Sequence, residues 1–340
     1  MPHYLSESRK PMSLNPAIET APPAAPLGMR FGGWGTAALL LAVWLALIVA
    51  TAIYRADFLS QQTLLAVTFT MAVVGVLAIG QGLVAISGGF IDLSQPANLI
   101  GASLVAVRLS EAGMPLPVVI VGAILAGMAW GAANAAIIVF AKLNPVIVTL
   151  ATNFIGLAAL YLVFQLAEVP LGSEIYQFGR AQLFGLPAIF WPMLLLVLVV
   201  GFLVPRTRYG RRMIAVGGNR AAAKARGISL ATTRFATFIA AGGFVGFAAV
   251  LFAATSGPFN PSSASPLQLN IIAGVILAGI SLAGGRGNFW MLLLSIGFLS
   301  TLPTSLVFFG LSSDTQSIFQ GAILIIAVSI DGYRARKGTP

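Results

Sequence analysis

The stretch LLAVTFTMAVVGVLAIGQGLVAIS, residues Leu64 to Ser87, contains no charged residue. A helix that crosses a bilayer needs roughly 20 consecutive, mainly apolar residues, and this stretch is long enough. The whole chain has the same character: of its 340 residues, 58% are hydrophobic and 8% are charged. Soluble domains have about 25% charged residues. We therefore predict an all-α, polytopic membrane protein.

Ten hydrophobic segments follow one another along the chain, with polar connections between them. They cover residues 34–54, 64–87, 92–109, 117–140, 146–166, 187–204, 232–254, 267–283, 289–309 and 316–332. The third and eighth are short and rich in Gly, Pro or polar residues, so we expect broken or partly re-entrant elements there. Glycines inside other segments, such as Gly127, Gly131, Gly242 and Gly246, predict close packing between helices.

The positions of Lys and Arg predict the orientation of these ten segments, because cytoplasmic loops are enriched in both residues. With a cytoplasmic N-terminus, sixteen of the nineteen Lys and Arg residues fall inside, and only Arg55, Arg108 and Arg180 fall outside. We therefore expect about ten transmembrane helices and both termini in the cytoplasm.

Three regions follow from this topology. Residues 1–30 are rich in Pro, Ser and Ala and have no apolar run, which predicts a disordered cytoplasmic tail. Residues 31–333 form the transmembrane domain, with a cytoplasmic loop at 205–231, and residues 334–340 form a short cytoplasmic C-terminal tail.

Several kinds of site are disfavoured by the composition. The chain has no cysteine, and its one histidine, His3, lies in the N-terminal tail, which disfavours a metal centre. No lysine is part of a Walker A loop, so we expect ATP hydrolysis, if any, on another chain. The net charge of +10 comes from residues between hydrophobic runs, and so indicates topology and contact with lipid rather than nucleic acid.

The cytoplasmic loop contains the charged stretch GGNRAAAKARGIS, residues Gly217 to Ser229. Asn219 is a good N-cap, the residues from Arg220 to Arg226 favour a helix, and Gly227 suits the left-handed position after its end. A helix this short is not stable alone in water. Its apolar side consists of four alanines, which suit close contact with a protein better than insertion into lipid. We therefore expect it to dock on another protein.

Four motifs of this chain occur together and in order in one known family. They are SGGFIDLS (Ser87–Ser94), NPVIVTLAT (Asn144–Thr152), AVGGNRAAAKARGI (Ala215–Ile228) and GVILAGISLAGGRG (Gly274–Gly287). From the second segment to the C-terminus, the sequence resembles the permeases of ribose-type ABC importers. The resemblance departs after Ser94, where Gln95 and Pro96 replace the usual Val-Gly, so it does not transfer substrate contacts to the neighbourhood of Asp92.

The resemblance implies a permease subunit in a bacterial inner membrane that moves a monosaccharide into the cytoplasm. Two copies would form the pathway, two cytoplasmic ABC ATPase subunits would hydrolyse ATP, and a periplasmic sugar-binding protein would deliver the substrate. The permease itself would bind no cofactor and would not be an enzyme. The short helix would be the coupling helix that enters a groove on the ATPase. The positions transferred to this role are Gly218, Asn219, Ala222, Arg226 and Gly227.

Uncharged polar residues inside the predicted spans are candidates for the substrate pathway. Together with one acid, the candidates are Gln81, Asp92, Asn134, Thr149, Thr152 and Asn153. Amides and hydroxyls can bond briefly to a neutral polyol, or they can bond one helix to another. Asp92 is expected near the cytoplasmic edge, where it either caps the third helix or contacts substrate or an ion.

Three other functions are alternatives for such a chain. An ion-coupled transporter of a small polar solute would need acids or histidines in mid-span, and the middle of the predicted segments has none. An intramembrane enzyme would lack the usual acid–base residues. A nucleoside-specific ABC permease stays open, because its relatives share similar motifs.

Overall fold

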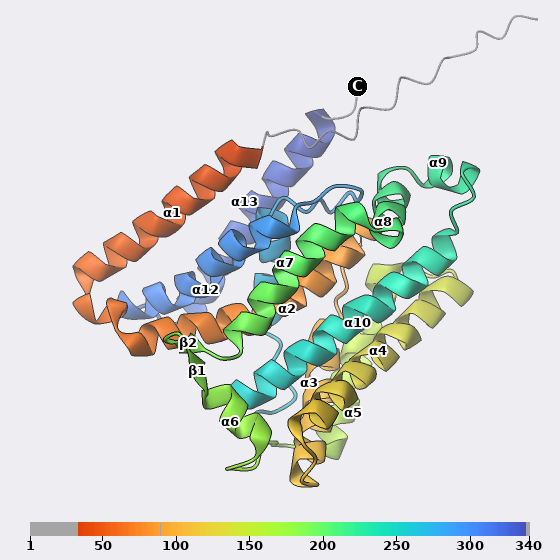
Figure 1. Ribbon diagram of the computed structural model, residues 1–340. Helices are drawn as coiled ribbons and strands as arrows, with labels where there is room; N and C mark the ends of the chain where they lie inside the picture. The colour runs from red at the N-terminus through yellow and green to blue at the C-terminus, as the bar shows by residue number, and fades with distance from the viewer. Residues whose placement is uncertain (1–32, 89, 338–340) are drawn as a thin grey trace, which may run out of the picture.

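The computed structural model describes residues 33–88 and 90–337 and consists of a bundle of helices (Figure 1). The predicted N-terminal tail, residues 1–30, lies outside the described residues. A helix coincides with each of the ten hydrophobic segments. These helices are α1 (Gly33–Tyr54), α2 (Gln61–Gly88), α3 (Gln95–Glu111), α4 (Leu116–Phe140), α5 (Pro145–Val163), α7 (Phe190–Arg206), α10 (Leu230–Thr255), α11 (Leu267–Leu277), α12 (Leu292–Phe308) and α13 (Ser313–Lys337).

Shorter elements connect these helices. They are the 3-10 helices η1 (Ala56–Leu59) and η2 (Phe289–Met291), the helices α6 (Glu174–Arg180), α8 (Arg208–Gly218) and α9 (Arg220–Ala225), and a two-stranded antiparallel hairpin of β1 (Gln182–Leu183) and β2 (Leu186–Pro187). α6 packs against the C-terminal end of α10, and α9 lies beside its N-terminal end. We call these two ends of the bundle the α6 end and the α9 end.

Six stretches of described helix are long and apolar enough to cross a membrane, and the bent pair of α7 and α8, at 73°, would be a seventh. The six lie in α1, α2, α4, α5, α10 and the η2–α12 stretch. α3 has 17 residues and α11 only 11, which agrees with the expectation of short or broken third and eighth elements. The multi-pass helical class is thus established, and the count of ten spans stays a prediction.

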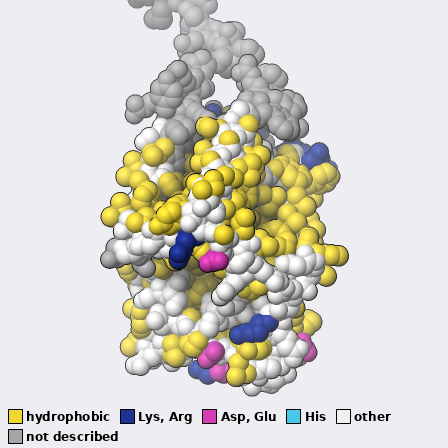
Figure 2. Space-filling model, turned by 90° about the vertical axis from the view of Figure 1, so that its left-hand side faces the viewer, with side chains coloured by type: hydrophobic (Ala, Val, Ile, Leu, Met, Phe, Trp, Pro, Cys, Tyr) yellow, Lys and Arg dark blue, Asp and Glu magenta, His cyan; other side chains and the backbone are white. Residues whose placement is uncertain are grey.

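The centre of the bundle is α2. Of its candidate membrane-spanning window, 72% is buried inside the protein, against 11% for α1 and 17% for α5. α2 packs against α7, α8, α10, α11 and α12, and α10 packs in turn against α3 and α4. The apolar surfaces of α1 and α5 therefore face outward, as the exposed side chains of Leu39, Ile53 and Leu162 show. Figure 2 shows one side of the molecule, on which hydrophobic side chains are widespread and charged ones are few.

The contact between α4 and α10 confirms the prediction of packing through glycines. A Cβ atom on Gly127 would lie 2.2 Å from the carbonyl oxygen of Gly242, and one on Gly131 would lie 2.2 Å from that of Phe238. A side chain at either position would push the two helices apart. The small residues therefore permit backbone-to-backbone contact, as in other helix pairs within membranes.

Candidate functional site

The chain forms neither helix nor strand at Phe90–Leu93, between α2 and α3. We call Phe90–Ser94 the break segment; Ser94 is the N-cap residue of α3. The segment turns back into the bundle, because Asp92 bonds to Gln81, seven residues before the last residue of α2. At 1.5 Å per helical residue, this is about 10 Å inside the end of that helix. Irregular backbone at such a depth needs hydrogen-bond partners from the surrounding protein.

The backbone of Asp92 is bonded by the side chain of Gln81, which is 1% exposed. In the orientation that its hydrogen bonds require, the Gln81 amide donates through Nε2 to the carbonyl oxygen of Asp92, and its Oε1 accepts from the N–H of Asp92, both at 3.1 Å. One side chain thus replaces two bonds that a regular helix would have supplied.

The carboxylate of Asp92 holds the start of α3. Its Oδ1 accepts from the backbone N–H of Ser94 at 2.8 Å and from the Ser94 hydroxyl at 2.7 Å. The hydroxyl oxygen of Ser94 accepts in turn from Nδ2 of Asn134 in α4 at 2.7 Å. Asp92 is buried inside the bundle, about 10 Å from the end of α2, and its predicted position near the cytoplasmic edge stays a prediction. The predicted capping role is close to what is observed, although Asp92 binds the N-cap residue rather than the first helical N–H groups.

Two predicted residues of α5 also bind this region. The hydroxyl of Thr149 accepts from the N–H of Leu93, and Oδ1 of Asn153 accepts from the N–H of Ala97, both at 3.1 Å. The hydroxyl of Thr152 donates instead to the carbonyl oxygen of Thr149 at 3.1 Å, within α5 itself. Five of the six predicted pathway residues therefore meet at the start of α3.

Sequence reasoning missed three further amides beside the same segment. Gln268 of α11 donates through Nε2 to the carbonyl oxygen of Asp92 at 3.3 Å, and Gln95 donates to that of Leu77 at 3.3 Å. Asn98 donates to the carbonyl oxygen of Gly127 at 3.4 Å. The side-chain oxygens of Gln95 and Gln268 are buried and have no hydrogen-bond partner among the described residues. All three amides lie in the short third and eighth hydrophobic segments. A polar residue in such a segment was the signal by which the sequence could have indicated them.

Among the described side chains, no Lys or Arg forms an ion pair with Asp92. The ion pair found there joins Arg108 and Glu111 on the surface. Hydrogen bonds alone therefore stabilise this carboxylate. Asp92 is 5% exposed, so the packed helices shield this acid from solvent.

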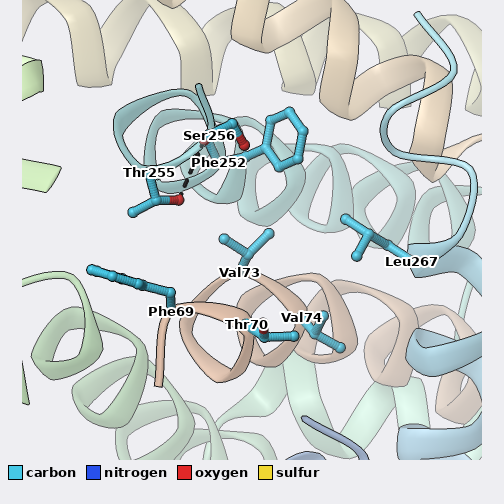
Figure 3. Close-up of a pocket in the computed structure, with 8 residues that line it drawn as sticks. All are labelled: Phe69, Thr70, Val73, Val74, Phe252, Thr255, Ser256 and Leu267. Atoms are coloured by element: carbon cyan, nitrogen blue, oxygen red, sulfur yellow. Dashed lines mark hydrogen bonds between the residues drawn. The ribbon is translucent and has the colours of Figure 1, made fainter. Parts of the chain in front are cut away.

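A cavity of about 180 Å³ is lined by eight residues, which Figure 3 shows as sticks. It lies nearer the α6 end, because Phe252 and Thr255 belong to the last turn of α10. It is lined by α2 on one side, by the last residues of α10 on the other, and by the start of α11. The lining residues are Phe69, Thr70, Val73, Val74, Phe252, Thr255, Ser256 and Leu267. Val74 lies about one helical turn from Leu77, whose carbonyl oxygen binds Gln95. The cavity and the amides around the break segment are therefore close along α2.

The predicted charged helix is confirmed as α9. The side chain of Asn219 accepts from the N–H of Ala222 at 2.9 Å, as an N-cap should. Gly227 has φ +75°, and the N–H groups of Gly227 and Ile228 bond to the carbonyl oxygens of Lys224 and Ala223, which is a Schellman motif. The helix ends at Ala225, so Arg226 is its C-cap residue.

α9 is presented outward. The five positions expected to contact another protein, Gly218, Asn219, Ala222, Arg226 and Gly227, are all exposed. Ala223 points into the molecule and is 3% exposed. A second helix in the same loop, α8, was not predicted. It is held through the buried residues Gly210, Met213 and Val216, while Arg208, Arg211 and Arg212 are exposed.

The end of α8 joins the bundle through contacts between backbones. A Cβ atom on Gly217 would lie 1.8 Å from the carbonyl oxygen of Ile86, near the end of α2, and 2.5 Å from the backbone nitrogen of Gly285. Gly285 has φ +70° and donates its N–H to the same Ile86 oxygen at 2.9 Å. We call this contact of Ile86, Gly217, Gly218 and Gly285 the glycine junction. It connects the two glycine-rich motifs, which are far apart in sequence, to the end of α2.

Comparisons with known proteins give a consistent result. The model of a family described as "Branched-chain amino acid transport system / permease component" matches residues 63–328. The L-arabinose ABC transporter permease protein AraH of Azospirillum brasilense is 26% identical over 336 residues, covering 98% of each chain. AraH of Escherichia coli K12 is 28% identical over 87% of this chain and 90% of its own.

The ribose import permease protein RbsC of Bacillus subtilis is 31% identical over 84% of this chain and 89% of its own. No solved structure matches the chain.

Proposed function

Because the chain belongs to the family of branched-chain amino acid transport system / permease components, we propose that it is the membrane-spanning subunit of an ABC importer for a monosaccharide. The match covers most of the chain, from the first turn of α2 to a point within α13. The relatives above are named for the import of arabinose and ribose, which supports a sugar of this size as the substrate. A nucleoside importer with the same architecture is the alternative.

The exposed, doubly capped α9 is the observation that supports ATP-driven import most directly. The chain itself has no Walker A lysine, so the energy must come from a partner. α9 is two turns long and too short to be stable in isolation, yet both of its ends are satisfied and its outer surface is uncovered. An ABC ATPase with a groove for this helix would supply the missing contact. The permease then binds no cofactor and catalyses no covalent step.

The side chains around the break segment favour a neutral polyol over an amino acid. An amino acid would require partners for both an ammonium and a carboxylate group. The side chains around the break segment supply amides, hydroxyls and the carboxylate of Asp92, which is already bonded to Ser94. We propose that the sugar passes the layer of Gln81, Asp92, Asn134, Thr149, Thr152 and Asn153, after the cavity between α2 and α10. Two phenylalanine rings and three hydroxyl groups line that cavity and suit the faces and hydroxyls of a sugar ring.

The distribution of charge supports a cytoplasmic α9 end, ten spans and an inner-membrane location. Exposed cations at this end include Arg208, Arg211, Arg212, Lys224, Arg226 and Arg286. Figure 1 places the start of α1 and the end of α13 near each other, consistent with both termini on one side. Because α3 and α11 are short, each would then cross the bilayer only together with the irregular segment attached to it. Lipid would cover the exposed face of α1, and a second permease copy would complete the pathway.

The first test is a detergent pull-down from native membranes. Wild-type protein is compared with a variant in which residues 220–227 are scrambled. We expect an ATPase with a Walker A loop to co-purify with the wild type and to be lost with the scramble. A second arm measures uptake of radiolabelled L-arabinose, D-ribose and uridine, the last as a probe for the nucleoside alternative. Absence of any ATPase under conditions that preserve membrane complexes would contradict the proposal and favour ion-driven uptake.

A further inference from the structure

Arg220 is the residue of α9 whose side chain reaches the end of α2. Its Nη2 donates to the carbonyl oxygen of Gly88 at 2.6 Å. Its guanidinium carbon also lies 4.9 Å from the centroid of the Phe90 ring. Both contacts are charge-assisted, and both are made to the residues at which the chain leaves α2 and enters the break segment. α9 is therefore attached to this segment by a side chain, in addition to its backbone connection through α8.

The ring of Phe90 also contacts α10, one of the central helices of the bundle. The guanidinium carbon of Arg234, in α10, also lies 4.9 Å from the centroid of Phe90. Nε of Arg234 is buried and has no hydrogen-bond partner in the part of the chain that the structure describes. Two cations thus share one aromatic ring, and no described acid forms an ion pair with either. Like charges repel, so the position of Phe90 depends on where Arg220 lies relative to Arg234.

The position of Phe90 in turn affects Asp92, two residues further along an irregular segment. Such a segment has no internal helical bonds that would absorb a displacement. Its fixed points are the bonds to Gln81, Thr149 and Gln268 from three different helices. A displacement at Phe90 must therefore change these bonds. By contrast, the glycine junction fixes α8 to α2 through backbone contacts and gives α8 little freedom to move on its own.

We propose that Arg220 is a positioning residue that transmits movement of α9 to the break segment, and thereby to the polar layer around Asp92. The proposal rests on the proposed function, since the force on α9 comes from the ATPase. It adds the route: through Arg220 and Phe90 into the backbone of Phe90–Ser94, rather than through a rigid movement of α10 or α2.

The test uses the complete importer, with permease, ATPase and binding protein, in proteoliposomes. The variants are Arg220→Ala, Arg220→Lys and, as a matched control, Arg206→Ala. Arg206 makes the same two kinds of contact, with the ring of Phe202 at 4.1 Å and with the carbonyl oxygen of Phe202 at 3.4 Å. Because these contacts are internal to α7, they do not link α9 to the break segment. Sugar uptake, ATP hydrolysis and ATPase co-purification are measured for each variant.

A second readout follows the break segment itself. The chain has no cysteine, so Ile91→Cys provides a single site for a fluorescent maleimide. In the otherwise wild-type protein, we expect the rate of labelling to change when AMP-PNP is added. With Arg220→Ala, we expect the ATPase to bind and to hydrolyse ATP, while uptake per ATP falls about tenfold and the AMP-PNP effect on labelling disappears. Arg220→Lys, which can still donate to the Gly88 oxygen, should retain part of the coupling, and Arg206→Ala should retain all of it.

Three results would overturn the inference while leaving the proposed function intact. They are normal uptake per ATP in Arg220→Ala, loss of ATPase binding in that variant, or equal uncoupling in Arg206→Ala. If the wild-type permease neither binds an ATPase nor takes up L-arabinose, D-ribose or uridine, the proposed function fails, and this inference fails with it.

Discussion

Replacing Gly217 with alanine should destabilise the protein by an amount that the glycine junction determines. The new Cβ atom would lie 1.8 Å from the carbonyl oxygen of Ile86, so α8 and α2 would have to separate by more than an ångström. This movement would weaken the bond from the N–H of Gly285 to the same oxygen, now 2.9 Å long, at a cost of about 1 kcal/mol. Overpacking a close contact adds about 1–3 kcal/mol. We expect a total loss of about 2–4 kcal/mol.

The assay is thermal unfolding of the purified permease in mild detergent, followed by the fluorescence of its five tryptophans. A loss of this size should lower the midpoint by about 3–6 °C in a chain of 340 residues. Gly218→Ala is the control, because its Cβ atom would find its nearest neighbour, the Cα of Gly285, at 3.9 Å. This variant should melt at the wild-type temperature or slightly higher, since alanine favours a helix over glycine by about 1 kcal/mol. Equal midpoints for Gly217→Ala and wild type would refute the close contact of α8 with α2.

Three further substitutions test the break segment and α9. Asp92→Asn keeps the oxygen that accepts from Ser94, so uptake of L-arabinose or D-ribose should stay within about twofold of wild type. Asp92→Ala removes this oxygen, and uptake should fall about tenfold or more. Equal loss of uptake in both variants, with normal assembly, would assign the role to the charge. Asn153→Leu removes the acceptor for the N–H of Ala97 and should cost about 1–3 kcal/mol in thermal unfolding, while Asn153→Asp, which keeps the acceptor, should cost less. Asn219→Ala removes the N-cap of α9, worth about 1 kcal/mol, and should weaken ATPase binding about fivefold in a pull-down titration. Asn219→Ser should bind normally, and equal weakening by both substitutions would exclude capping as the reason.

Local features were the most predictable part of this structure. The caps of α9 lie within a few residues of the groups they bind, as Asn219 does with Ala222, so sequence alone was sufficient to place both ends of that helix. The ten hydrophobic segments each coincide with a helix because apolar length is itself a local property. α8 was missed because its stretch is rich in Arg and Gly. Its helical form depends on packing of Met213 and Val216 against the bundle.

The candidate site was predictable only residue by residue. Gln81, Asn134, Thr149 and Asn153 stood out as polar residues in apolar surroundings, but nothing local indicates that they share one target. Their bonds to the region of Asp92 cross from other helices, and the Asn134–Ser94 and Thr149–Leu93 bonds join residues 40 and 56 apart in sequence. For the same reason, the sequence did not indicate that the chain after α2 returns to Gln81. Hydropathy places the end of a helix, but not a chain that turns back beside it.

The break segment also has a consequence for how the protein is made. Its partners appear in the order of synthesis: Gln81 first, then Asn134 and Thr149, and finally Gln268, which lies 176 residues after Asp92. Until α11 leaves the ribosome, one of the two side chains that bind the carbonyl oxygen of Asp92 does not yet exist. A growing chain would therefore hold α3 next to an incompletely bonded backbone through most of translation. We expect early α3 to stay near water or the insertion machinery, and to reach its final depth only when α11 docks.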